Sequence, residues 1–435
     1  MPAPSFIDRL GDAHRAAVAS LPGASLPEVI ARRQAALDSF RRHGLPTARL
    51  EAWKFTSLTG LERQVPPQPA NEGSIEAARL AAAALSGENF RLVFVSGRFN
   101  AAASNLAGLP KGVRLLPLSQ AGAELPAMLA PAGDDRAGSL AELNAAFASD
   151  GLLLQIDDGV VLERPIELLA FGAPALVNLR HLVRLGRKAE AVLVESYRDA
   201  GSAEAGWSNI VAGIELAQGA KLTHIRLQDE AANAYHAALG QVSVGEEARY
   251  AHVSVQGGGR IARHELQIQF AGRGAEVDVQ GLALVCGASL IDHTLRLHHA
   301  LPDCRSNQLF KHVVDEQGHA VFQGGIRVAP QAQKTDAQQL SRTLLLADRA
   351  QIDTKPELEI LADDVKCSHG ASIGDVDAQQ LFYMQARGIS AAEARRLLLS
   401  GFAYEIVSAV PEGALRDHVE AFVETWLAQK KDGQA

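Results

Sequence analysis

The residues best suited to chemistry in this sequence are a cysteine and a histidine separated by one serine, Cys367-Ser368-His369. A thiolate and an imidazole can bind Fe(II), Zn(II) or one corner of an iron–sulfur cluster, and they can also act as a nucleophile and its base. Side chains two residues apart point to the same face of a β-strand, so a strand here would present both donors together. For an isolated C-x-H pair, however, a buried thiol beside a hydrogen-bonded histidine is the more common arrangement.

The other reactive residues give weaker signals. His293, His298 and His299 lie in one β-rich segment, but adjacent residues on a strand face opposite sides, so we expect structural histidines there and no metal site. Three cysteines, at 286, 304 and 367, are too few for a disulfide framework, and no C-x-x-C pair is present. The sequence has no G-x-x-x-x-G-K-[ST] motif, so we expect no ATP hydrolysis by a P-loop.

Composition limits the classes of function. The 435 residues carry a formal net charge of -8, which opposes binding to nucleic acid or to anionic lipid. The first 20 residues contain no apolar signal region, and no run of about 20 apolar residues occurs. We therefore expect a cytoplasmic protein with no membrane or nucleic-acid partner.

The elements that would position Cys367 and His369 are short strands. Between about residues 150 and 376, runs of β-forming residues are broken every eight to twelve residues by Gly, Asp or Asn. A turn signature places alanines at 189, 220, 248 and 275, which are 31, 28 and 27 residues apart, and a further copy has its alanine at 350. A β-solenoid gives such a period, and a β-sandwich is the alternative.

Helical patterns flank this region. We predict a helical N-terminal region with a Pro-rich linker (1–90), a transition segment (91–149), the β-helix core (150–376) and a helical C-terminal region (377–435). Ser25 with Glu28, and Ser390 with Glu393, have capping-box spacing. The last helices carry more apolar residues than a small cap needs, which favours core packing with part left for a docking groove: Leu397, Leu398, Phe402, Ile406, Phe422 and Trp426.

Two stretches of the sequence resemble a known family. Residues 338–402, which include "DDVKCSHGASIGDVDAQQLFYMQARGIS", closely resemble the C-terminal part of the SufB/SufD family of the SUF iron–sulfur cluster assembly machinery. The stretch "EAWKFTSL" (51–58) resembles a motif of the SufD branch. Chain length and scarce cysteines also favour that branch over the longer SufB branch.

The resemblance implies a mainly β fold, a right-handed parallel β-helix between helical terminal regions. It implies a non-catalytic scaffold that pairs with SufB, binds the ABC-type ATPase SufC through residues 377–435, and can form a homodimer in isolation. His369, with Cys367 close by, would lie near the SufB interface and take part in iron entry or cluster formation. The cluster or iron would be transient, ATP would bind only to the partner ATPase, and the main sulfur acceptor would be on SufB.

Two other functions stay open from the sequence. A β-helix can be a carbohydrate-active enzyme, with Asp363 and Asp364 as acid/base groups or calcium ligands. It can also be an interaction module without metal chemistry.

Overall fold

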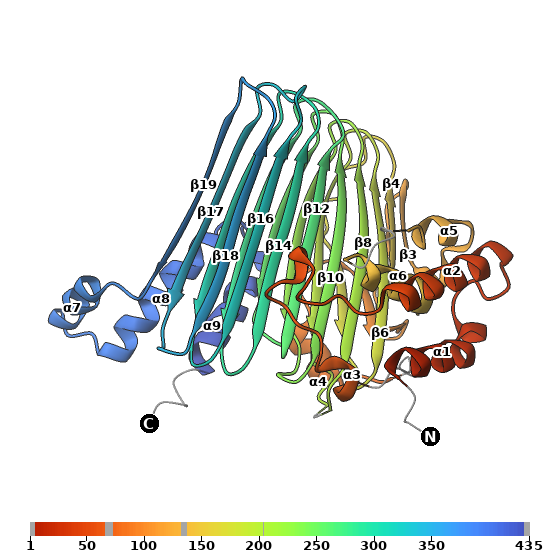
Figure 1. Cartoon of the computed structure of the whole chain (residues 1–435), viewed down its shortest axis with the longest axis horizontal. Coiled ribbons are helices and arrows are strands. Elements are labelled where there is room, and N and C mark those ends of the chain that lie inside the picture. Colours follow the sequence, from red (N-terminus) through yellow and green to blue (C-terminus); the bar gives the residue numbers. More distant parts are fainter. Residues whose placement is uncertain (1–4, 66–72, 132–136, 203, 430–435) are drawn as a thin grey trace.

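Strands with alternating side-chain orientation build the centre of the molecule. The computed structural model describes residues 5–65, 73–131, 137–202 and 204–429. Between residues 153 and 374 the chain forms a β-solenoid of about eight turns, with one strand of each of two sheets in every turn (Figure 1). The predicted solenoid with helical terminal regions is confirmed, and the β-sandwich alternative is wrong.

The two sheets have ten and nine strands. The ten-stranded sheet contains β1 (Phe90–Val95), β2 (Arg98–Phe99), β5 (Ile166–Phe171), β7 (Glu190–Arg198), β9 (Lys221–Asp229), β11 (Arg249–Gln256), β13 (Glu276–Val285), β15 (Arg305–Val314), β17 (Asp336–Leu345) and β19 (Lys366–Gly374). The nine-stranded sheet contains β3 (Val113–Pro117), β4 (Leu152–Ile156), β6 (Leu176–Leu185), β8 (Trp207–Leu216), β10 (Tyr235–Val244), β12 (Ile261–Phe270), β14 (Leu290–His299), β16 (His319–Val328) and β18 (Gln351–Ile360).

The two ends of the solenoid differ. At its start, β2 pairs antiparallel with β1, and β3 pairs antiparallel with β4. The other strands of both sheets pair in parallel, and the sheets end in β19 and β18, each of which has one neighbouring strand among the described residues. A parallel strand at the end of a stack leaves one row of backbone N–H and C=O groups without a sheet partner.

The repeated alanines mark the turns into one sheet. Ala189, Ala220, Ala248 and Ala275 are fully buried, and each directly precedes a strand of the ten-stranded sheet. In each turn the preceding residue has a positive φ, as at Lys188 and Gly219. The alanine at 350 instead precedes β18 of the nine-stranded sheet, so this copy of the signature lies in a different set of turns. A small side chain fits where the turns of successive coils stack.

The helices of the N-terminal region, which lie before and between the first strands, pack against the first coils. They are α1 (Phe6–Ala17), α2 (Pro27–His43), α3 (Leu61–Gln64), α4 (Ala77–Ala83), α5 (Leu125–Met128) and α6 (Ser139–Phe147). The Ser25 cap is wrong: Leu26 is the N-cap residue, without a side-chain hydrogen bond, and Pro27 supplies the first helical turn instead. Most of the predicted Pro-rich linker (66–72) lies outside the described residues.

The C-terminal helices are α7 (Ala378–Ala386), α8 (Ala391–Val407) and α9 (Ala414–Gln429). Ser390 caps α8 as expected, accepting the Glu393 N–H. Figure 1 shows α8 and α9, in blue, lying behind the strands. Ile406, Val407 and Trp426 form one buried cluster with Ile225 and Val253 of the ten-stranded sheet. These two helices therefore complete the core, and α7 extends away from it.

The buried lysine Lys311 on β15 helps to hold α8 against the sheet. Its Nζ donates to the Phe402 carbonyl at 2.8 Å, lies 4.3 Å from the centre of the Phe402 ring, and forms an ion pair with Glu405. Burial lowers the pKa of the Lys311 ammonium. Over the described ranges, no helix combines the length and the apolar character needed to cross a membrane.

Candidate metal site at the open end of the solenoid

Cys367 and His369 lie on the last strand, β19, on the face that points into the solenoid. Cys367 is in register with Ala337 of β17, and His369 is in register with Gln339. Ala337 and Gln339 are both buried inside the coil, and residues in register on parallel strands share a face. The chain therefore brings the thiol and the imidazole to one face of one strand.

The two donors differ in their surroundings. Cys367 is half-buried against an apolar cluster that includes Val328 and Ala362, and its burial together with the nearby Asp336 carboxylate raises the pKa of its thiol. His369 is exposed. Within the described part of the chain, no group of three or more His, Cys, Asp or Glu side chains is placed to hold a metal ion. Cys367 and His369 are thus two potential donors, and a complete metal site here would need ligands from elsewhere.

The last coil, which carries Cys367 and His369, exposes apolar side chains and edge strands. Ile360 of β18 is exposed, and Ile373 of β19 is 53% exposed, although both continue columns of inward-facing residues. Pro356 lies within β18, where its missing N–H is tolerated because an edge strand has no second neighbour. Apolar side chains and free strand edges on one surface are typical of a protein interface.

The remaining sequence candidates lie elsewhere. His293 and His299 are buried, whereas His298 is half-buried on the opposite face of β14, as strand alternation predicts. Burial lowers the pKa of His299 to about 4. Cys304 is buried, donates to the Gly272 carbonyl at 3.3 Å, and has its thiol pKa raised by burial.

The two candidate acid residues lie in the turn before β19. Asp363 and Asp364 are exposed, and Asp364 forms an ion pair with Lys334. A carboxylate neutralised by a lysine in an exposed turn gives little support to acid/base catalysis.

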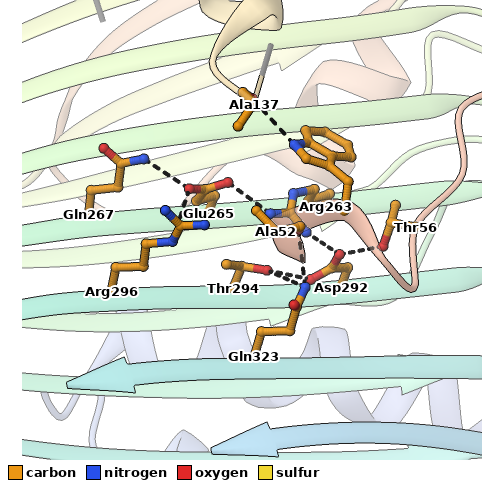
Figure 2. Close-up of polar contacts among 11 residues, drawn as sticks. Ala52, Thr56, Ala137, Arg263, Glu265, Gln267, Asp292, Thr294, Arg296 and Gln323 are labelled. Atoms are coloured by element: carbon orange, nitrogen blue, oxygen red, sulfur yellow. Dashed lines mark hydrogen bonds and ion pairs between the residues drawn. The ribbon is translucent and has the colours of Figure 1, made fainter. Parts of the chain in front are cut away.

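Sequence reasoning missed how the motif at 51–58 is used. This segment, the N-terminal strap, crosses the outer face of the nine-stranded sheet (Figure 1). The Trp53 ring lies 4.3 Å from the guanidinium carbon of Arg263, and the Trp53 indole N–H donates to the Ala137 carbonyl at 3.3 Å. Thr56 donates to Asp292, which is also ion-paired with Arg263. Figure 2 shows Thr56 of the strap, Asp292 and Arg263 converging on one another.

The strap reaches the last coil. Gln323 of β16 donates from its side-chain nitrogen to the Ala52 carbonyl at 3.2 Å, and Lys355 of β18 forms ion pairs with Glu51 and Glu357. The motif therefore ties the N-terminal region to the strands beside the open end. Its Trp and Thr were visible in the sequence, but their buried partners, Arg263 and Asp292, lie over 200 positions further along the chain.

A buried polar network inside the solenoid was also missed. Glu195 accepts the Tyr197 hydroxyl at 2.9 Å and lies 3.2 Å from the His224 ring nitrogen, and the other His224 nitrogen bonds the Tyr250 hydroxyl at 2.9 Å. Burial opposes ionisation of Glu195, but His224 and the nearby Arg226 together hold its pKa below the usual range. Alternating polar residues in "KLTHIRLQD" (221–229) were the available signal, and they look the same in a strand with a solvated face.

Comparison with known proteins agrees with this architecture. Residues 170–402 match the model described as SUF system FeS cluster assembly, SufBD core domain, and residues 8–168 match the SufBD protein N-terminal region. The core match spans most of the solenoid together with β19, α7 and part of α8. The N-terminal match includes the strap.

Several relatives are similar over most of their length. The chain is 33% identical over 419 residues to an iron–sulfur cluster assembly SufBD family protein of Synechocystis, covering 91% of this chain and 90% of that protein. It is 32% identical over 402 residues to the iron–sulfur cluster assembly protein SufD of Escherichia coli, covering 88% and 90%. It is 35% identical over 297 residues to the chloroplastic protein ABCI7 of Arabidopsis thaliana, covering 66% and 62%. Family models across both regions and these long alignments show that the chain belongs to the SufBD family of the SUF iron–sulfur cluster assembly system.

Proposed function

We propose that this chain is the SufD-type, non-catalytic scaffold subunit of a cytoplasmic SUF assembly complex. It pairs with a SufB-type subunit through the open end of the solenoid and recruits a SufC-type ATPase through the C-terminal helices. Iron or a nascent cluster is the cargo of the interface, held there only transiently. In the absence of SufB, a second copy of this chain can occupy the same open end.

The observation that carries the proposal is the position of His369. The imidazole lies on the inner face of the terminal strand, the same strand face as exposed Ile373, and β19 and β18 are the last strands of their sheets. A partner that adds its own strands to β18 or β19 covers this face and brings ligands within reach of it. Two donors on one side of an interface and the remaining ligands on the other would complete a site suited to iron.

Exposed side chains on the C-terminal helices support ATPase docking there. Phe382 and Tyr383 on α7 are 72% and 60% exposed, and Leu397 on α8 is also exposed. Tyr404 on α8 is exposed as well, whereas apolar residues of the same helix such as Ile406 pack on the sheet. Large exposed aromatic residues on one helix are typical of an interaction surface.

Replacing His369 by alanine tests the proposal. In the complex reconstituted with SufB-type and SufC-type partners, an iron salt and a sulfide source, we expect His369→Ala to lower the cluster formation rate at least tenfold, as loss of one ligand does. Co-purification of the partners and the circular dichroism spectrum should not change, because the side chain is exposed. Cys367→Ala should have the smaller effect, since the main sulfur acceptor is expected on the partner.

Ser368→Ala is the matched control, because Ser368 is exposed on the opposite face of the same strand. It should leave cluster formation unchanged. A His369→Ala complex that assembles clusters at the normal rate would refute the proposed role. Equal losses in the His369 and Ser368 variants would assign the effect to the strand itself.

A further inference from the structure

A column of inward-facing side chains leads directly to His369. Val279 of β13, Gln308 of β15, Gln339 of β17 and His369 of β19 are in register on successive parallel strands. Gln308 and Gln339 are buried, at 0% and 3% exposed. Neighbouring strands lie about 4.8 Å apart, a spacing at which amide side chains in register form hydrogen-bonded ladders. The column is thus a short glutamine ladder with a histidine at its end.

The ladder has a direction. Gln339 donates from Nε2 to Oε1 of Gln308 at 2.7 Å. Gln308 Oε1 thus faces the following coil, and Gln308 Nε2 has no hydrogen-bond partner among the described residues. Each amide therefore points its nitrogen towards the preceding coil, and in a planar amide the oxygen then points towards the following coil.

For Gln339, the following coil is β19. Gln339 Oε1 is buried and has no hydrogen-bond partner in the described part of the chain. The amide is held from the side by β16, since a Cβ on Gly324 would lie 2.1 Å from Gln339 Nε2. Only glycine leaves room for the amide in this orientation. A buried acceptor held in this way costs free energy unless it receives a hydrogen bond.

We propose that Gln339 is a positioning residue for His369: its Oε1 accepts the N–H of the imidazole, so that the other ring nitrogen faces the partner subunit and the metal. This inference rests on the proposed function. A neutral imidazole binds a metal through its unprotonated nitrogen, and a hydrogen bond to the other nitrogen fixes the tautomer and the ring orientation. Backbone carbonyls and carboxylates usually serve as such acceptors, and here the ladder supplies an amide oxygen.

Two measurements on the full chain test the role of Gln339. The first is the tautomer of His369, read from nitrogen chemical shifts of histidine-labelled protein. The second is Fe(II) affinity in the complex with the SufB-type partner. Gln339→Leu should change His369 from one tautomer to a mixture and weaken Fe(II) binding by about 10- to 100-fold, the usual effect of removing such an acceptor. Gln339→Glu keeps an acceptor at this position, so it should keep a single His369 tautomer and an Fe(II) affinity close to that of the wild type.

Two further variants separate positioning from stability. Gln308→Leu breaks the same amide–amide hydrogen bond but keeps Gln339 Oε1, so it should lower the unfolding temperature like Gln339→Leu while keeping most of the Fe(II) affinity. Gln338→Leu changes the exposed, opposite face of β17 and should alter neither measurement.

A single His369 tautomer and unchanged Fe(II) affinity in Gln339→Leu would overturn the inference. Loss of the single tautomer and of Fe(II) affinity in Gln339→Glu would overturn it as well. If His369→Ala leaves Fe(II) affinity unchanged, the proposed function fails, and the tautomer measurement still decides whether Gln339 orients the ring.

Discussion

Acid should destabilise this protein through the histidines buried in its solenoid, and His312 allows the effect to be measured. His312 is fully buried on β15, its Nδ1 lies 3.3 Å from the Thr343 hydroxyl, and its Nε2 has no hydrogen-bond partner among the described residues. Burial lowers the pKa of His312 from 6.5 to about 4. Replacing it by glutamine removes this titrating group and keeps a polar side chain.

The sign follows from proton binding. Between the folded pKa of about 4 and the unfolded pKa of 6.5, the unfolded chain binds more protons at His312 than the folded chain does. The free energy of unfolding is therefore unaffected by this group above pH 6.5 and falls as the pH decreases towards 4. One pKa unit corresponds to about 1.4 kcal/mol, so the loss through His312 is roughly 2 kcal/mol at pH 5 and about 3 kcal/mol in full.

Urea unfolding of the wild type and His312→Gln at pH 7 and pH 5 measures this loss. Whatever the substitution costs at pH 7, that cost should become about 2 kcal/mol smaller at pH 5. Phe322→Leu, a change of a buried neighbouring side chain that does not titrate, should have the same cost at both pH values. A His312→Gln cost that is equal at pH 7 and pH 5 would refute the reasoning.

Two further predictions concern the strap and the C-terminal helices. Trp53→Ala should lower the free energy of unfolding by about 3–5 kcal/mol, the usual cost of truncating a buried large aromatic residue. Lys54 is exposed, so Lys54→Ala should change the free energy of unfolding by less than about 0.5 kcal/mol. Equal costs of the two variants in urea unfolding would show that Trp53 does not anchor the strap. Joint replacement of Phe382 and Tyr383 by serine should weaken binding of the SufC-type ATPase by about 30-fold or more, the effect of losing roughly 2 kcal/mol at an interface hot spot, without lowering the unfolding temperature. Gln385→Ser on the same helix is the control, and unchanged ATPase binding in the double variant would place the docking surface elsewhere.

The repeat was predictable because the same residue types recur every 27 to 31 residues along the sequence. Ala189 and Ala220 recur where coils stack, and strand alternation correctly placed Cys367 and His369 on one face. The start of α2 was not predicted, because capping-box spacing at Ser25 and a proline at position 27 are competing start signals, and the proline determined the start. Local patterns identify elements well, but they do not decide between neighbouring start signals.

The surroundings of the candidate site could not be read from the sequence in the same way. Gln308 and Gln339 become a ladder only when strands 31 residues apart stack in register, and their polar side chains look the same on a solvated strand. The apolar residues of the last two helices gave no indication of which would be covered. Ile406 and Trp426 pack on the ten-stranded sheet, and only Leu397 of the predicted set is among the large exposed apolar residues.

The route of the chain after β19 supports a site shared between two subunits. The first coils are closed by antiparallel strands and by helices such as α6, so the molecule can cover a solenoid end with its own segments. At the other end, α8 and α9 pack on the outer face of the ten-stranded sheet and leave β18 and β19 as sheet edges. The edge strand β19 therefore carries exposed Ile373 and the two potential ligands, Cys367 and His369, on one face. In the proposed complex, a partner that covers these edges is also in position to complete the proposed site, so subunit pairing and metal binding would be coupled.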